Sequence, residues 1–85
     1  MPWLMKLDKL PLREKWRVAA IDWSLIPDSE GHRLRSLGMD EGVAVEALHR
    51  GVMLARDPLA IRVGRMTIAI RRKVAAQITC QPEQA

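Results

Sequence analysis

The sequence predicts a mostly β fold, a small and partly open barrel of about five short strands with one short α-helix. Apolar and polar residues alternate along several short segments, and glycines and prolines separate these segments at close intervals. A two-residue turn, Gly64-Arg65, joins two of the segments. A chain of 85 residues forms one hydrophobic core rather than two. We therefore expect an N-terminal arm over 1–14, a barrel domain over 15–80 and a frayed tail over 81–85.

The first strand and the helix after it are predicted from alternation and from helix-capping residues. Residues 16–20 alternate in the manner of a strand with one buried face. Pro27 ends the extended stretch that follows. Asp28 or Ser29 is expected to accept hydrogen bonds from the free N–H groups at the start of a helix of about two turns. Gly38 is expected to end that helix in the left-handed conformation.

The helix should place Leu34 and Leu37, three residues apart, on one buried face. Asp40-Glu41-Gly42 then predicts a turn, because glycine adopts positive φ without strain. The run 43–50 is rich in strand-forming residues and holds no proline or glycine, so we expect the second strand there. Residues 51–57 are expected to form a loop.

The next two strands form the most distinct local pattern in the chain. Apolar residues recur at every second position over 59–63 and again over 66–70. Only two residues separate the two runs, and a two-residue loop that starts with Gly64 predicts a type II′ hairpin. Residues 71–77 favour a helical turn, and 78–80 supply a last short strand.

Four segments of this pattern resemble a known family. They are Arg33-Leu34 through Leu37-Gly38-Met39 to Gly42 before a strand, Asp57-Pro58-Leu59 opening another strand, Val63-Gly64-Arg65-Met66 at the hairpin, and Ile68-Ala69-Ile70-Arg71 followed by Ala75 and Ile78. In this order, which spans more than half of the chain, they resemble the FeoA family. Members usually carry a glycine near the start of the first strand, where this chain has Arg13-Glu14-Lys15.

The resemblance implies a fold and a partner. FeoA-like proteins are small SH3-like cytosolic components of bacterial ferrous iron uptake, and a related barrel forms the C-terminal domain of DtxR-type iron-dependent repressors. The resemblance therefore implies a non-enzymatic accessory protein that binds the FeoB ferrous iron transporter, a membrane protein with a cytosolic GTPase domain. We expect no cofactor, and we expect contact with the membrane only through that partner.

Composition agrees with a binding protein of a reducing compartment. The formal net charge is +4, from 14 Lys and Arg against 10 Asp and Glu, which hints at an acidic partner or a solubilising surface. Cys80 is the only cysteine, so no intrachain disulfide framework is expected. No run approaches the ~20 apolar residues of a membrane span. We expect a cytoplasmic protein.

Two kinds of chemistry have little support in the sequence. His32, His49, Asp57 and Cys80 carry side chains that suit a transition metal, which leaves a metal-responsive regulatory module as an alternative. Their spacing matches no ligand pattern, however, so we expect no metal site. The serines lie in no nucleophile motif and no glycine-rich phosphate loop is present, so we expect no enzyme.

A second alternative is a nucleic-acid-binding SH3-like or Sm-like barrel. Arg71-Arg72-Lys73, with Arg62 and Arg65 expected close by on the hairpin, form the densest basic cluster. Phe and Tyr are absent, so only the three Trp could stack on bases. We therefore expect a protein partner rather than nucleic acid.

The expected partner-binding surface combines the loop after the second strand with the basic cluster. Apolar side chains in that loop either contact a partner or fold back as a lid over the barrel. The predicted partner-binding residues are Met53, Leu54, Arg56, Arg65, Arg71 and Arg72. Trp3 and Leu4 in the arm either cover the barrel of their own chain or mediate homo-oligomerisation.

Overall fold

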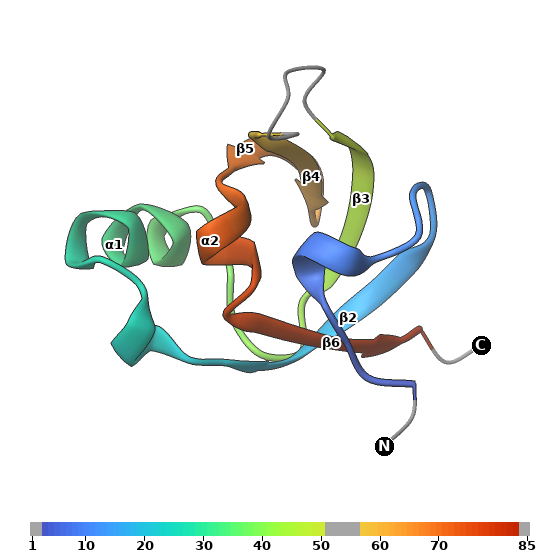
Figure 1. Cartoon of the computed structure of the whole chain (residues 1–85), viewed down its shortest axis with the longest axis horizontal. Coiled ribbons are helices and arrows are strands. Elements are labelled where there is room, and N and C mark those ends of the chain that lie inside the picture. The colour runs from blue at the N-terminus through green and yellow to red at the C-terminus, as the bar shows by residue number, and fades with distance from the viewer. Residues whose placement is uncertain (1–2, 51–56, 84–85) are drawn as a thin grey trace.

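In the computed structural model, residues 3–50 and 57–83 are described, and their six strands form one antiparallel sheet (Figure 1). The order of the strands is β1-β6-β2-β3-β4-β5, so β1 and β5 are the two edges. The strands are β1 (Met5–Lys6), β2 (Lys15–Ile21), β3 (Ala44–Arg50), β4 (Leu59–Val63), β5 (Met66–Ile70) and β6 (Ile78–Pro82). Register shifts in the β2–β6 and β3–β4 pairs mark bulges, which increase the twist and help the sheet curl around its core.

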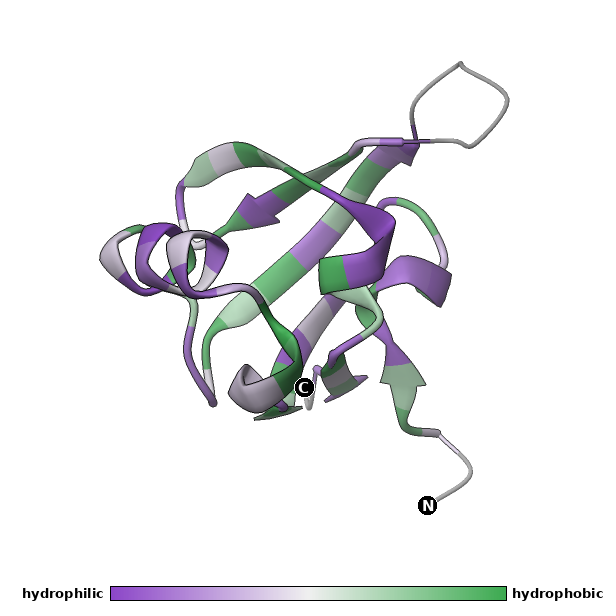
Figure 2. Cartoon of the chain, turned by 60° about the vertical axis from the view of Figure 1, so that its left-hand side comes forward, coloured by the Kyte–Doolittle hydropathy of each residue, from purple (hydrophilic) through white to green (hydrophobic). Residues whose placement is uncertain are grey.

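Alternation of side chains along the strands builds that core. In β4, Leu59, Ile61 and Val63 are buried. In Figure 2, hydrophobic and hydrophilic positions alternate along the strands, as expected for a sheet with one face turned inward. The sequence prediction of a mostly β, partly open barrel is therefore confirmed, and the strand at Met5–Lys6 adds a sixth strand to the expected five.

The described part of the N-terminal segment, residues 3–14, contributes to this fold. Met5 and Lys6 pair with Cys80 and Thr79 of β6. A 3₁₀ turn, η1 (Leu7–Lys9), follows and buries Leu7. At the other end of the chain, β6 extends to Pro82, two residues beyond the predicted strand.

Helix α1 (Asp28–Ser36) begins differently from the prediction and ends as predicted. Its N-cap is Pro27, and no side chain accepts a hydrogen bond from its first turn, so the expected capping by Asp28 or Ser29 is wrong. Asp28 and Glu30 instead lie in the first turn, where carboxylates favour the positive end of the helix dipole.

Its C-terminus is a Schellman motif. Gly38 has a φ of 94°, its N–H donates to the carbonyl of Arg35 at 3.0 Å, and the N–H of Met39 donates to the carbonyl of Leu34 at 2.9 Å. Leu34 and Met39 are both buried, and they supply the apolar pair that accompanies this motif. The predicted left-handed glycine is therefore confirmed.

The hairpin between β4 and β5 has the predicted turn. Gly64 has a φ of 60°, whereas Arg65 is not among the residues with positive φ. This combination distinguishes type II′ from type I′, in which both central residues need positive φ. The turn fixes the register, which pairs Val63 with Met66 and Leu59 with Ile70.

Two further helical turns complete the described chain. One is η2 (Trp23–Leu25), which precedes α1, and the other is α2 (Arg72–Ala75), which lies within the predicted helical segment 71–77. Arg13, shortly before β2, has a φ of 65°, in the left-handed region that favours glycine. No helix among the described residues is long and apolar enough to cross a membrane.

Candidate partner-binding surface

Three of the six predicted partner-binding residues, Arg65, Arg71 and Arg72, lie at the two ends of β5. Arg65 is in the turn before β5, Arg71 follows its last residue as the N-cap of α2, and Arg72 begins α2. The other three predicted residues, Met53, Leu54 and Arg56, lie outside the residues that the structure describes.

The expected basic cluster is spread along β5, with Arg65 at one end of the strand and Arg71, Arg72 and Lys73 at the other. We call these four residues the basic strip. Arg65 and Arg71 are separated by the length of β5, about 20 Å of extended chain at ~3.3 Å per residue. Both are exposed, and neither side chain has a hydrogen-bond or ion-pair partner in the described part of the chain. Arg62, expected near the same cluster, approaches Glu46 at 3.8 Å. Two positive charges without counter-charges therefore mark the two ends of one edge strand.

Asp57 organises the C-terminal end of this strip. Its Oδ1 accepts a hydrogen bond from the backbone N–H of Arg72 at 2.8 Å, which satisfies one of the free donors at the start of α2. The peptide bond between Asp57 and Pro58 is cis. The carboxylate considered as a metal ligand in the sequence thus caps a helix from a distance of fifteen residues.

Removing this cap should destabilise the protein modestly. We expect Asp57→Ala to lower the free energy of unfolding by about 1–2 kcal/mol, because a partly buried N–H of α2 loses its acceptor. Asp28→Ala is the matched control, since Asp28 is exposed at the start of α1 and makes no capping bond. Urea denaturation of the two variants measures the difference, and equal losses would contradict the capping role.

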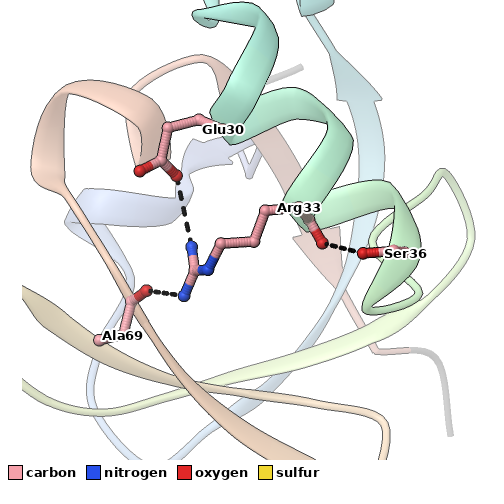
Figure 3. A network of polar contacts seen from close by, with 4 residues as sticks. All are labelled: Glu30, Arg33, Ser36 and Ala69. Atoms are coloured by element: carbon pink, nitrogen blue, oxygen red, sulfur yellow. Dashed lines mark hydrogen bonds and ion pairs between the residues drawn. The ribbon is translucent and has the colours of Figure 1, made fainter.

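Arg33 connects α1 to β5 (Figure 3). One guanidinium nitrogen, Nη1, lies 3.3 Å from Glu30 Oε1, and the other, Nη2, donates to the carbonyl of Ala69 at 2.9 Å. The Glu30–Arg33 pair follows an i, i+3 spacing that the sequence displays. The contact with Ala69 joins residues far apart in the chain, and no sequence pattern indicated it.

A hollow of about 320 Å³ lies beside this contact. Its lining residues come from α1, the start of β4, the end of β5 and the start of α2: Glu30, Arg33, Asp57, Pro58, Ala69 and Arg71. Within it, Arg33 offsets the charge of Glu30, and Asp57 is engaged with α2. Arg71 is left as the lining charge without a counter-charge among the described residues.

The aromatic residues offer little surface for stacking on bases. Trp16 is 7% exposed. The ring of Trp23 is covered by the guanidinium of Arg35, which lies 4.3 Å from its centroid. Trp3, at 50% exposure, is the one indole largely open among the described residues.

The residues considered as metal ligands do not come together. His32 and His49 are exposed, whereas Cys80 is fully buried in β6. Burial raises the pKa of the Cys80 thiol to about 12, because the thiolate would lose its hydration. Across residues 3–50 and 57–83, no three His, Cys, Asp or Glu side chains are grouped so as to hold a metal ion.

Comparison with known proteins relates this geometry to one family. The sequence model of the FeoA domain matches residues 5–82. FeoA of Stenotrophomonas maltophilia is 28% identical with a TM-score of 0.74, covering 91% of this chain and 89% of that one. That protein was solved with zinc and is described as a prokaryotic SH3 domain protein with a suggested role as a ferrous iron transport activating factor.

Two more distant structures share the fold. FeoA of Chlorobium tepidum is 24% identical with a TM-score of 0.78, covering 94% of this chain and 71% of that one. IdeR of T. acidophilum is 18% identical with a TM-score of 0.74, covering 94% of this chain and 34% of that one. No curated protein is a significant match to the chain.

Proposed function

Because the chain belongs to the FeoA family, a family of ferrous iron transport, we propose that it is a non-enzymatic accessory protein that binds the cytosolic GTPase domain of a FeoB-type transporter. In this proposal the protein works in the cytoplasm and reaches the membrane only through its partner. The family match over residues 5–82 carries the proposal.

The surface described above supports a binding role. Arg65 and Arg71 are exposed cations without counter-charges in the described residues, and they stand at the two ends of one strand. Charges of this kind steer an acidic partner and fix its orientation more than they add to affinity. The arrangement therefore favours recognition of an acidic protein surface.

Titration calorimetry tests the proposal directly. The full chain is titrated into the cytosolic GTPase domain of a FeoB-type transporter from the same organism, without nucleotide, with GDP and with a non-hydrolysable GTP analogue. We expect saturable one-to-one binding in at least one of these states. Absence of binding in all three states would overturn the proposal.

A nucleic-acid-binding role is the competing hypothesis from the basic strip. Phosphate contacts by Arg65, Arg71 and their neighbours would give binding that falls steeply with salt. The covered Trp16 and Trp23 leave few stacking surfaces in the described structure, which is why we favour the protein partner. A gel shift at low and moderate salt separates the two hypotheses.

A further inference from the structure

The outer edge of β5 carries backbone groups that no other strand of the described residues engages. In a two-residue hairpin the residues that flank the turn, Val63 and Met66, form a hydrogen-bonded pair, and every second pair after them does the same. In β5 the residues bonded to β4 are therefore Met66, Ile68 and Ile70. Thr67 and Ala69 direct their N–H and C=O groups away from β4, toward the open edge of the sheet.

One of these outward groups is already occupied. The carbonyl of Ala69 accepts the hydrogen bond from Arg33 Nη2 at 2.9 Å, which confirms that it faces outward (Figure 3). The guanidinium of Arg33 thus occupies the one acceptor at this end of β5 that a neighbouring strand would otherwise use. Within residues 3–50 and 57–83, the edge retains the N–H and C=O of Thr67 and the N–H of Ala69.

The charges around this edge discriminate between possible occupants. The strand itself, Met66–Ile70, is uncharged and rich in residues that favour strands. Arg65 and Arg71 flank it, both exposed and both without a partner among residues 3–50 and 57–83. An added strand would therefore meet a neutral centre with a cation at each end.

A second copy of this chain is a poor occupant. Two β5 strands that pair antiparallel along their full length place Thr67 of one copy opposite Ala69 of the other. In that register Arg65 of each copy lies opposite Arg71 of its neighbour, and like charges directly opposite one another destabilise a strand pair. This full-length pairing of two copies is thus disfavoured.

We propose that the β5 edge binds an extended acidic segment of a protein partner by adding it to the sheet as a further strand. Its backbone would pair with Thr67 and with the N–H of Ala69, and its acidic side chains, about six residues apart, would lie beside Arg65 and Arg71. The hollow beside Ala69 gives the second acidic group room next to Arg71.

The inference rests on the proposed function only for the identity of the natural partner, so its test uses a synthetic probe. The probe is a heptapeptide with glutamates at both ends and alternating valine and threonine between them, and the matched control has lysines at its ends. Each is added to the full ¹⁵N-labelled chain. The readouts are peptide affinity and the amide hydrogen exchange of Thr67 and Ala69, with Ile68, already bonded to β4, as the internal reference.

We expect the acidic peptide to bind at least about tenfold more tightly than the lysine peptide, and to slow exchange at Thr67 and Ala69 but not at Ile68. The variant Arg65→Glu/Arg71→Glu should abolish this preference. Arg13→Glu/Arg35→Glu, which changes net charge equally at two other exposed arginines, should preserve it.

Two results with the peptides would overturn the inference: equal affinity for both peptides, or no protection of the Thr67 and Ala69 amides from exchange. Two further results would also overturn it: protection of the same amides by a thymidine decanucleotide, or their protection when the concentration of the chain alone is raised.

Failure of the proposed function would give a different pattern. In that case the GTPase domain does not bind in any nucleotide state, while the acidic peptide still protects the β5 amides from exchange. The reverse pattern, a bound GTPase domain and an unprotected β5, would overturn only the inference.

Discussion

Leu34→Ala is expected to lower the free energy of unfolding by about 3 kcal/mol, enough to leave so small a domain marginally folded. Leu34 is fully buried, and its carbonyl accepts the N–H of Met39 in the motif that ends α1. Truncation leaves a cavity at the place where α1 is fixed to the core. Because Arg33 reaches Ala69 from the same helix, loosening α1 should also release the edge of β5.

Leu25→Ala provides the matched control. Leu25 is 63% exposed in η2, so the same loss of atoms should change the free energy of unfolding by less than about 0.5 kcal/mol. Urea denaturation measures both variants, with the same dependence of unfolding free energy on urea concentration used for each. Equal destabilisation by the two substitutions would contradict the packing of α1 described here.

The second large effect is a loss of stability in alkali that depends on Cys80. Burial raises the thiol pKa from 9.0 to about 12, so the folded state holds this proton more tightly than the unfolded chain does. The stabilisation of the folded state by the buried, protonated Cys80 thiol is fully present below pH 9. It is lost progressively as the pH rises from 9 to about 12. The difference of about three pKa units corresponds to roughly 4 kcal/mol at ~1.4 kcal/mol per unit.

Other groups also titrate in this range, so a comparison of two proteins isolates the thiol. Cys80→Ala removes the titrating group, and the difference in unfolding free energy between wild type and variant should shrink as the pH is raised above 9. The parent chain should also resist thiol alkylation at neutral pH until denaturant unfolds it. A difference that stays constant with pH, or rapid alkylation of the folded chain, would contradict the burial of Cys80.

Local patterns account for the parts of the fold that the sequence predicted. The hairpin is encoded within a dozen residues by alternation and by Gly64, so its turn type and register could both be anticipated. The end of α1 is similarly local, because Gly38 and the buried pair Leu34 and Met39 lie within six residues. Strand β1 was missed because Met5–Lys6 is too short to show a period, and its partners lie at the other end of the chain.

The basic residues of the candidate site were chosen from the sequence, and the structure shows how they are arranged. Arg65 and Arg71 are exposed, but β5 separates them, so the basic residues form a strip and not the expected cluster. Asp57 was considered for its carboxylate, whereas its role in capping α2 depends on a contact across fifteen residues. The bond from Arg33 to Ala69 depends on how α1 packs against the sheet, which periodicity does not encode.

The most direct test of the central claim is the amide chemical-shift map of the ¹⁵N-labelled chain with the cytosolic GTPase domain of a FeoB-type transporter. The proposed function and the basic strip together predict saturable changes that are largest from Arg65 to Lys73. Small changes are expected at β1, on the opposite edge of the sheet. Unchanged spectra in every nucleotide state, or changes confined to β1 and β6, would contradict the account.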